Sequence, residues 1–313
     1  MPESAGIRIS VVICAHTVDR WAELETGVAS VLDQTHKPHE VIVSVDHDDA
    51  LLERSQRAFP DARVVANEGE PGVSGARNTG IRHATGDVVA FVDDDARADR
   101  HWLEVIARAH SDPAVLGTGG LIEPSWTGPA PEWMPPELYW IVGCSYRGLP
   151  TTVAPLRNPI GANMSFLRDV FADVGGFSDE LGRLGGVPGS CEETEFSIRA
   201  LRGRPDTVVL HLPEARVLHT VPRSRATWRY LVKRCWTEGR AKALVTRAVG
   251  SSAGLAEERS YATRVLPAAL FSGLRDALGG DPHGLGRAAA IVSALGITLA
   301  GYVYGRAVGA HAG

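Results

Sequence analysis

The first hundred or so residues alternate between short apolar runs and segments with helical spacing. Residues 9–14, 41–45 and 88–92 are apolar and rich in β-branched side chains, which is typical of strands buried on both faces of a sheet. The segment 21–32 places its apolar side chains on one face of a helix. Strands separated by helices of this length predict right-handed βαβ units and an α/β fold with a mostly parallel sheet. The same patterns predict helices at 50–59, 73–84 and 101–110 and further strands at 62–66 and 115–122.

Polar or charged residues follow three of the predicted strands. His16 follows the first, Asp46 the second, and Asp93 to Asp95 the fourth. In open α/β sheets, ligands bind beyond the carboxyl ends of the strands. The pattern therefore predicts a binding site at this edge of the sheet.

The chain changes character after this region. Residues 123–157 are rich in Pro, Trp and Tyr and predict irregular structure over the sheet edge. Such a segment either binds a second substrate or packs as a long connection, and both readings stay open. A further helix is predicted at 192–201, and short strands at 208–212 and 215–218.

The C-terminal part predicts a helical region with a basic face. The chain is thus expected to comprise an α/β domain over 1–222 and a helical region over 223–313. Residues 223–247 hold eight Lys and Arg against one acid, Glu238, beside an apolar stripe that includes Trp228. Such a helix suits an anionic membrane surface, and a solvated face over an ordinary core explains it equally well.

Residues 288–305 carry no charge. As a helix they would be about 27 Å long, close to the thickness of the hydrocarbon core of a bilayer. Ala, Gly, Ser and Thr dominate and contribute little to insertion, whereas Gly301 and Gly305 allow close helix packing. We therefore expect this helix to lie on a membrane or to pack on a partner rather than to span the bilayer.

The composition narrows the functional classes. With a formal net charge of -5, the chain is not expected to bind nucleic acid through a general basic surface. The N-terminus has no apolar stretch of a secretory signal, so we expect a cytoplasmic protein, with the basic tail at the cytoplasmic face of the cell membrane. Four distant cysteines match neither a zinc spacing nor a disulfide framework: Cys14, Cys144, Cys191 and Cys235.

The acidic residues 93–95 end a buried strand. Such crowded carboxylates need counter-charge, which a divalent metal would supply. A small number of oxygen ligands favours Mg²⁺ or Mn²⁺. Asp93 and Asp95 form the Asp-x-Asp pair of such a site, and an acidic turn without a metal is the alternative.

Two further clusters carry candidate chemistry. The glycine-rich segment 72–80 leads into a helix, where Arg77 and Asn78 can reach a phosphate or a ribose. It lacks the ending of a Walker loop, and no Gly-x-Gly-x-x-Gly follows the first strand, which weighs against a nicotinamide-dependent oxidoreductase. Glu192 and Glu193 open a predicted helix, whose dipole favours ionised carboxylates, as a general base requires.

Together, these segments resemble the family 2 glycosyltransferases of the GT-A fold. The resemblance implies a Rossmann-like sheet and an inverting enzyme that moves a sugar from a nucleotide-sugar donor to an acceptor hydroxyl. The acceptor would be a carbohydrate, a lipid-linked or a small molecule, in polysaccharide, glycolipid or glycoconjugate biosynthesis. The resemblance covers roughly residues 7–220 and rests on ISVVICAH (9–16), SVLDQTHKPHEVIVSVD (30–46), GVSGARNTGIRHATGDVVAFVDDD (72–95), GANMSFLRDVFADVGGF (161–177) and CEETEFSIRA (191–200).

The resemblance also implies roles for residues at matching positions. It implies a divalent cation, Mg²⁺ or Mn²⁺, on Asp93 and Asp95, with His219 near it. It implies that Glu193, the second member of the pair with Glu192, is the catalytic base. The residues implied for donor binding are Ala15, His16, Asp46, Arg77, Asn78, Asp93 and Asn163.

Two positions depart from the family pattern, and two other classes fit the same features. The family usually has Asp where Glu193 stands and Tyr-Asn where His16 and Thr17 stand. A nucleotidyltransferase also binds nucleotides and Mg²⁺ on an α/β sheet, but it releases pyrophosphate instead of a nucleoside diphosphate. A non-catalytic partner with a degenerate site would show neither donor hydrolysis nor metal dependence.

Overall fold

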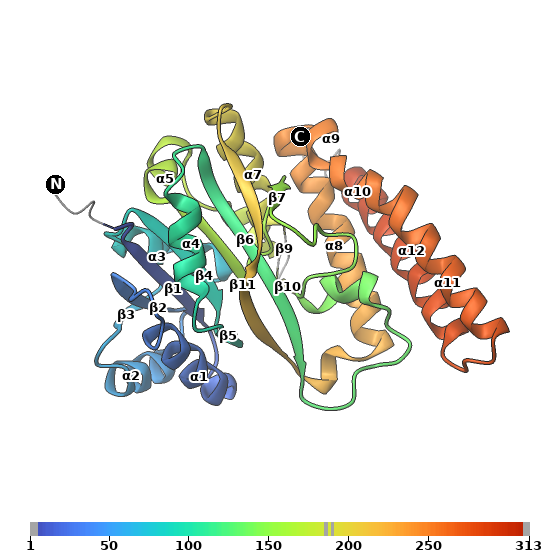
Figure 1. Cartoon of the computed structure of the whole chain (residues 1–313), viewed down its shortest axis with the longest axis horizontal. Coiled ribbons are helices and arrows are strands. Elements are labelled where there is room, and N and C mark those ends of the chain that lie inside the picture. The colour runs from blue at the N-terminus through green and yellow to red at the C-terminus, as the bar shows by residue number, and fades with distance from the viewer. Residues whose placement is uncertain (1–5, 185–186, 189–190, 309–313) are drawn as a thin grey trace. The chain divides into compact units, whose positions relative to one another are not determined.

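The chain divides into two compact units. The computed structural model describes residues 6–184, 187–188 and 191–308. The first unit holds most of the sheet, and the second is mainly helical (Figure 1). The predicted domain boundary after residue 222 stays a prediction. The first unit comprises Met1–Glu123, Pro150–Gly182 and Glu192–His219, and the second comprises Pro124–Leu149, Arg183–Cys191 and Thr220–Gly313.

Four parallel strands form one half of the sheet, in the order β3-β2-β1-β4. The apolar runs of β1, β2 and β4 are buried because helices cover a parallel sheet on both faces, whereas β3, at the edge of the sheet, is partly exposed. The predicted elements of this half are confirmed, with ends that differ by one residue at most. The strands are β1 (Ile9–Ala15), β2 (Glu40–Val45), β3 (Arg63–Ala66) and β4 (Val88–Asp93), and the helices are η1 (Val18–Arg20), α1 (Trp21–Leu32), α2 (Asp49–Ala58) and α3 (Val73–His83).

The other half of the sheet is antiparallel, so the sheet is mixed. β8 runs antiparallel to β4 and β6, and β11 runs antiparallel to β5 and β7. The alternation of strands and helices that predicts parallel pairing holds only as far as β4. The strands of this half are β5 (Ala96–Ala98), β6 (Val115–Trp126), β7 (Ala154–Leu156), β8 (Asn163–Leu167) and β11 (Val208–Val221), and the helices are α4 (Trp102–His110), α5 (Arg168–Val174), α6 (Asp179–Gly182) and α7 (Glu192–Gly203).

β11 is one continuous strand, so the prediction of two short strands was wrong. Pro213 has no N–H and therefore suggests a break in a strand. Along the edge that faces β5 and β7, however, β11 pairs over residues 209–211 and again over 217–219. Pro213 lies between these two pairings, so its missing N–H interrupts neither ladder.

A buried polar chain in the first unit predicts a loss of stability in acid. His110 Nε2 lies 2.8 Å from Ser165 Oγ, and burial lowers the pKa of His110 from 6.5 to about 4. Between these values the unfolded chain binds more protons than the folded one, so stability falls as the pH falls through this window. We expect His110 to contribute up to about 3 kcal/mol to this loss, measured as the free energy of unfolding in denaturant. His110→Gln should flatten the pH dependence, whereas His101→Gln at an exposed position should not; equal slopes would contradict the assignment.

The second unit is built on α8 and α12, which pack along each other. Glycines allow this contact. A Cβ at Gly239 would overlap the carbonyl oxygen of Thr298, and a Cβ at Gly301 would lie 2.5 Å from the carbonyl oxygen of Trp236. The middle segment, predicted to be irregular, contains one 3-10 helix, η2, and contributes β7 to the sheet. The other elements are η2 (Pro136–Val142), β9 (Arg183–Leu184), β10 (Val187–Pro188), η3 (Arg223–Arg225), α8 (Trp228–Val249), α9 (Ser251–Gly254), α10 (Ala256–Ser260), the π-helical turn η4 (Tyr261–Val265), α11 (Leu266–Leu278) and α12 (Gly284–Val308).

α12 contains the uncharged segment 288–305, which is helical as predicted. Among the residues that the structure describes, α12 is the one helix long and apolar enough to cross a membrane, with a mean hydropathy of 1.6 over its most apolar stretch. Only 28% of that stretch is buried. The helix packs on α8 of its own chain, and its contact with a membrane stays a prediction here.

Candidate active site

Adjacent strands bring the predicted site residues to one edge of the sheet. β2, β1 and β4 are neighbours and run parallel. Ala15 and Asp93 are the last residues of β1 and β4, and His16 and Asp46 directly follow β1 and β2. The three strands lie side by side in Figure 1. The residues at their carboxyl ends therefore bring a backbone turn, an imidazole and several carboxylates to one edge of the sheet.

Three of these side chains can share one metal ion. Ligand atoms of Asp93, Asp95 and His219 all lie within 4.8 Å of one another, and His219 Nε2 is 3.0 Å from Asp95 Oδ1. β11 delivers His219 to the cluster, because His219 pairs with Ala96, one residue after the acidic run. Burial raises the pKa of Asp93; Arg77 opposes this effect and the Asp95 carboxylate reinforces it. Two carboxylates and an imidazole in this setting fit Mn²⁺, and also Mg²⁺ when water completes its shell.

Asp94 is turned to a different partner, Arg20. Arg20 Nη1 donates to Asp94 Oδ1 at 2.8 Å and lies 3.1 Å from Asp95 Oδ2. His16 Nδ1 lies 3.6 Å from the other oxygen of Asp94. Arg20 thus supplies positive charge beside the acidic run, a role that the sequence did not reveal because its partners are more than seventy residues away.

Arg77 connects the metal cluster to the acidic pair. Its buried guanidinium donates to Glu192 Oε1 at 2.6 Å and lies 3.5 Å from Asp93 Oδ1. Arg77 Nη2 also donates a hydrogen bond to the Gly161 carbonyl oxygen at 3.2 Å. A Cβ at position 161 would lie 2.6 Å from this Nη2 atom. Burial disfavours the charge, but the two carboxylates outweigh it and raise the pKa of Arg77.

Loss of Arg77 should therefore destabilise the fold. Arg77→Met would leave the buried carboxylate of Glu192 and the partly exposed one of Asp93 without their cation, at a cost of about 3–5 kcal/mol. Chemical denaturation measures the change in the free energy of unfolding. Arg57→Met, at an exposed position of α2, is the control and should change it by less than about 0.5 kcal/mol. A stability change in Arg77→Met as small as that of the control would contradict the ion-pair network.

Asp46 holds the loop that follows β3. Its Oδ1 accepts a hydrogen bond from Asn67 Nδ2 at 2.7 Å, and its Oδ2 accepts one from the Gly72 N–H at 2.8 Å. Asn67 was not found from the sequence, since a loop Asn carries no signal of its own. Both oxygens of Asp46 are thus engaged with this loop, and its contact with a donor stays a prediction.

The two acids at the start of α7 differ in their surroundings. Glu192 is 5% exposed and bound to Arg77 through Oε1, while its Oε2 has no hydrogen-bond partner among the described residues. Glu193 is only partly buried. The cluster that the sequence singled out also includes Gly189 and Ser190, which lie outside the described residues. Of the two acids, Glu193 is the more exposed to solvent.

Two predicted donor-binding asparagines have their amides engaged within the fold. Asn163 is 1% exposed; its oxygen accepts from Trp102 Nε1 at 2.8 Å, and its nitrogen donates to two carbonyl oxygens. Asn78 exchanges hydrogen bonds with the backbone of Phe177. These contacts position β8 and α3 beside the site, and a direct contact of either residue with a donor stays a prediction.

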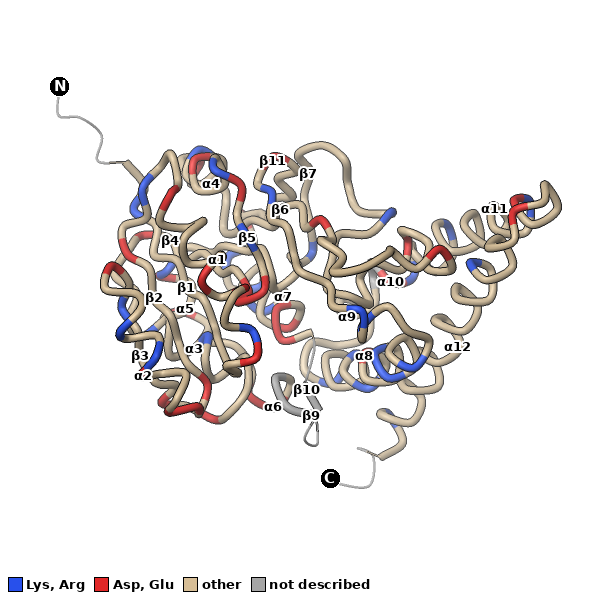
Figure 2. The backbone as a smooth tube through the Cα atoms, turned by 90° about the horizontal axis from the view of Figure 1, so that it is seen from below, with Lys and Arg blue, Asp and Glu red and all other residues tan. Residues whose placement is uncertain are grey.

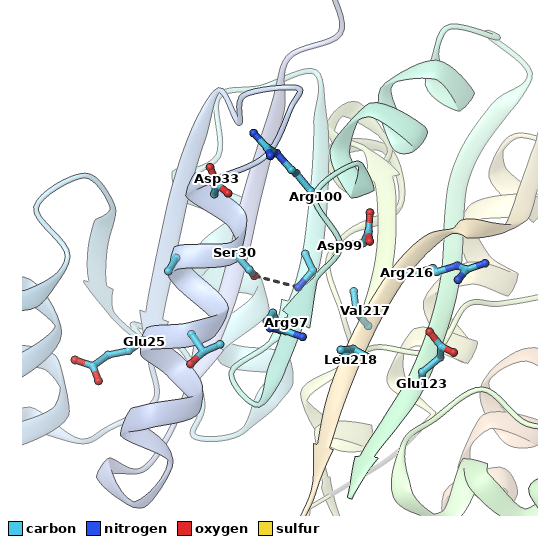
Figure 3. Close-up of a pocket in the computed structure, with 13 residues that line it drawn as sticks. Glu25, Ser30, Asp33, Arg97, Asp99, Arg100, Glu123, Arg216, Val217 and Leu218 are labelled. Carbon is cyan, nitrogen blue, oxygen red and sulfur yellow. Dashed lines mark hydrogen bonds between the residues drawn. The ribbon is translucent and has the colours of Figure 1, made fainter.

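A separate groove lies beside α1 and shares no residue with this site. Its volume is about 790 Å³, and Figure 3 shows side chains from α1, β5, β6 and β11 around it. Arg97, Arg216 and Glu123 are among its charged residues. The predicted catalytic, donor-binding and metal-binding residues do not line it.

Comparison with known proteins places the same segments in one family. The family model described as "Glycosyl transferase family 2" matches residues 10–175. The glucosyl-dolichyl phosphate glucuronosyltransferase of Haloferax volcanii is 35% identical over 240 residues, which cover 75% of this chain and 76% of the relative. The succinoglycan biosynthesis protein ExoM of Rhizobium meliloti is 28% identical over 243 residues, which cover 74% of this chain and 73% of the relative.

Solved structures agree on the fold. The mannosyltransferase PcManGT of Pyrobaculum calidifontis, in complex with GDP-Man and Mn²⁺, superposes with a TM-score of 0.60 at 16% identity, over 95% of this chain and 88% of that chain. GalNAc-T7, with UDP, GalNAc and Mn²⁺, gives a TM-score of 0.52 at 20% identity, over 70% of this chain and 45% of that one. These likenesses confirm the predicted GT-A fold class.

Proposed function

Because this chain belongs to glycosyl transferase family 2 and is a glycosyltransferase of glycoconjugate biosynthesis, we propose that it transfers a sugar from a nucleotide-sugar donor to an acceptor hydroxyl with inversion. The observation that carries this proposal is the link between two clusters. Asp93 and Asp95, at the end of β4, lie beside His219 of β11, and Arg77 ties Asp93 to Glu192 at the start of α7. This link would hold the site for the diphosphate next to the helix that carries the proposed base, Glu193.

The metal cluster would bind the diphosphate of the donor. Asp93, Asp95 and His219 would hold Mn²⁺ or Mg²⁺, whose charge would offset that of the departing nucleoside diphosphate. Arg20 pairs with Asp95 and with its neighbour Asp94 and offsets part of the negative charge of the acidic run. Ala15, His16 and the loop held by Asp46 would receive the nucleoside.

Glu193 would act as the general base. It would take the proton of the acceptor hydroxyl while that oxygen attacks the anomeric carbon. The bond between the anomeric carbon and the phosphate oxygen breaks in the same step, so the configuration inverts and no sugar–enzyme bond forms. Glu192 would serve as a positioning residue, because its carboxylate is already bound to Arg77.

The acceptor is proposed to be a lipid-linked sugar. The name of the Haloferax volcanii relative describes transfer onto a glucosyl-dolichyl phosphate, and the helical second unit of this chain carries an apolar helix. The enzyme would then work at the cytoplasmic face of the cell membrane. No nucleic acid takes part in this reaction.

A donor panel tests the proposal directly. Purified protein would be titrated with UDP-, GDP- and dTDP-sugars, with and without Mn²⁺, while thermal stabilisation and slow donor hydrolysis are followed. We expect one donor to stabilise the protein only with metal and to release its nucleoside diphosphate. Release of pyrophosphate from a nucleoside triphosphate and a sugar 1-phosphate, assayed in parallel, would instead indicate a nucleotidyltransferase, and no response to any donor would reject the proposed reaction.

A further inference from the structure

α12 exposes a row of apolar side chains that its own fold leaves uncovered. Leu299 and Val303 are 59% and 58% exposed, one turn apart, while the opposite side of the helix is buried against α8. A solvated helix normally places polar side chains on such a face. The exposed side chains between residues 285 and 304 are instead all uncharged: Leu285, Ala289, Val292, Leu295, Leu299, Ala300, Val303 and Tyr304.

The apolar row continues onto α8 through aromatic residues. The rings of Trp236 and Tyr304 are 5.3 Å apart, which joins the exposed sides of the two helices. Val232 and Trp228 are exposed on the preceding turns of α8, and Trp228 stacks on Trp133 at 4.6 Å. Trp and Tyr are the side chains that favour the boundary between lipid and water. The docking face is defined here as Leu285, Val292, Leu295, Leu299, Val303 and Tyr304 of α12 together with Trp228, Val232 and Trp236 of α8.

Cations border this face on α8. The exposed charged side chains of α8 are Arg229, Lys233 and Arg247. Its one acid, Glu238, is buried and held by Arg234 at 2.9 Å and Lys242 at 3.1 Å. Figure 2 shows this concentration of Lys and Arg along α8. An apolar surface with a cationic border is complementary to anionic lipid headgroups over acyl chains.

We propose that the second unit binds an anionic lipid bilayer through the docking face, with α8 and α12 lying in the plane of the membrane surface. This deepens the proposed cellular location by naming the surface and its orientation, and it does not depend on which sugar is transferred. A second copy of the chain fits less well, because its cationic border would face another cationic border.

The packing of α12 argues against a transmembrane orientation. α12 touches α8 at the backbone, where Gly239 and Gly301 leave no room for side chains. If α12 crossed the bilayer, α8 would follow it and carry Arg240, Glu238 and Lys242 into the hydrocarbon. Each such charge is costly near the centre of a bilayer. Lying flat keeps Glu238 and Lys242 out of the hydrocarbon and places Arg240, whose guanidinium lies 5.9 Å from the centre of the Tyr304 ring, at the level of the lipid headgroups.

Vesicle flotation of the full chain tests the proposal. Wild type is expected to bind vesicles of phosphatidylcholine mixed with phosphatidylglycerol, to bind pure phosphatidylcholine more weakly, and to be released by alkaline carbonate. Leu299→Gln with Val303→Gln should weaken binding at least about tenfold, since two apolar side chains no longer enter the lipid. Arg229→Gln with Lys233→Gln should weaken binding roughly tenfold or more, only on anionic vesicles.

Two matched controls lie in the first unit. Val153→Gln removes an apolar side chain that is 61% exposed, and Arg57→Gln removes an exposed cation. Both should bind like wild type. The proposal would be overturned if the docking-face variants bound vesicles as well as these controls do, or if alkaline carbonate failed to release wild type. It would also be overturned if wild type formed a dimer without lipid and the double variant Leu299→Gln with Val303→Gln did not. Donor hydrolysis, assayed without vesicles, should be equal in all variants; its absence in wild type would reject the proposed reaction and leave the vesicle result standing.

Discussion

Glu193→Gln is expected to lower the turnover of sugar transfer by about 10²–10⁴-fold while donor affinity stays nearly unchanged. Gln keeps the size of the side chain and its place at the start of α7 but cannot accept the acceptor's proton. Glu193 is partly exposed, whereas Glu192 is buried and bound to Arg77. Single-turnover transfer and nucleotide-sugar titration, measured on the same preparation, separate the two effects.

Glu53→Gln is the matched control, because Glu53 lies on an exposed turn of α2. It should transfer sugar at the wild-type rate. If Glu193→Gln turned over as fast as this control, the base would have to be reassigned, and Glu192→Gln would be tested next. The latter variant weakens the pairing with Arg77, so its unfolding midpoint should be measured before its activity is interpreted.

Asp95→Asn should abolish metal-dependent donor binding and reduce turnover by about a thousandfold, as expected when the charge stabilisation supplied by a metal is lost. The change keeps the shape of the side chain but removes the negative charge that faces both His219 and Arg20. Calorimetric titration of Mn²⁺ in the presence of the nucleoside diphosphate measures the binding step. Treatment of wild type with a chelator should reproduce the loss of activity, and added Mn²⁺ should restore it.

Asp61→Asn removes an exposed acid between α2 and β3 and should leave Mn²⁺ binding unchanged. Mn²⁺ binding by Asp95→Asn with wild-type affinity would exclude the cluster as the metal site. If Mn²⁺ bound but turnover did not respond to it, the ion would have only a structural role.

The first half of the fold follows from local patterns. Helix α1 begins and ends where its apolar spacing predicts, at Trp21 and Leu32, and the buried strands match their β-branched runs. These signals lie within each segment, so no knowledge of a partner is needed. The antiparallel half depends on which distant strands meet, and β5 is only three residues long. A segment that short has no periodicity to detect.

The candidate site divides in the same way. Motif and family resemblance are enough to find the segments that contain Asp93, Asp95 and the Glu192–Glu193 pair. Arg20 and Asn67 do not, because each acts through one partner far away in the sequence. For Arg77, resemblance pointed to the donor, whereas its link between Asp93 and Glu192 became visible only in three dimensions.

The glycine contact between α8 and α12 sets the mutational tolerance of the C-terminal region. Gly239 and Gly301 sit where even a methyl group would strike a backbone oxygen, so nearly every substitution there should reduce the amount of folded protein. Positions such as Val292 and Leu299 on the outer side should accept most residues when solubility is the readout. A saturation-mutagenesis map would therefore show two interleaved helical stripes, one intolerant and one permissive. If the readout were instead activity in cells, where the proposed membrane binding matters, substitutions in the permissive stripe would also reduce function.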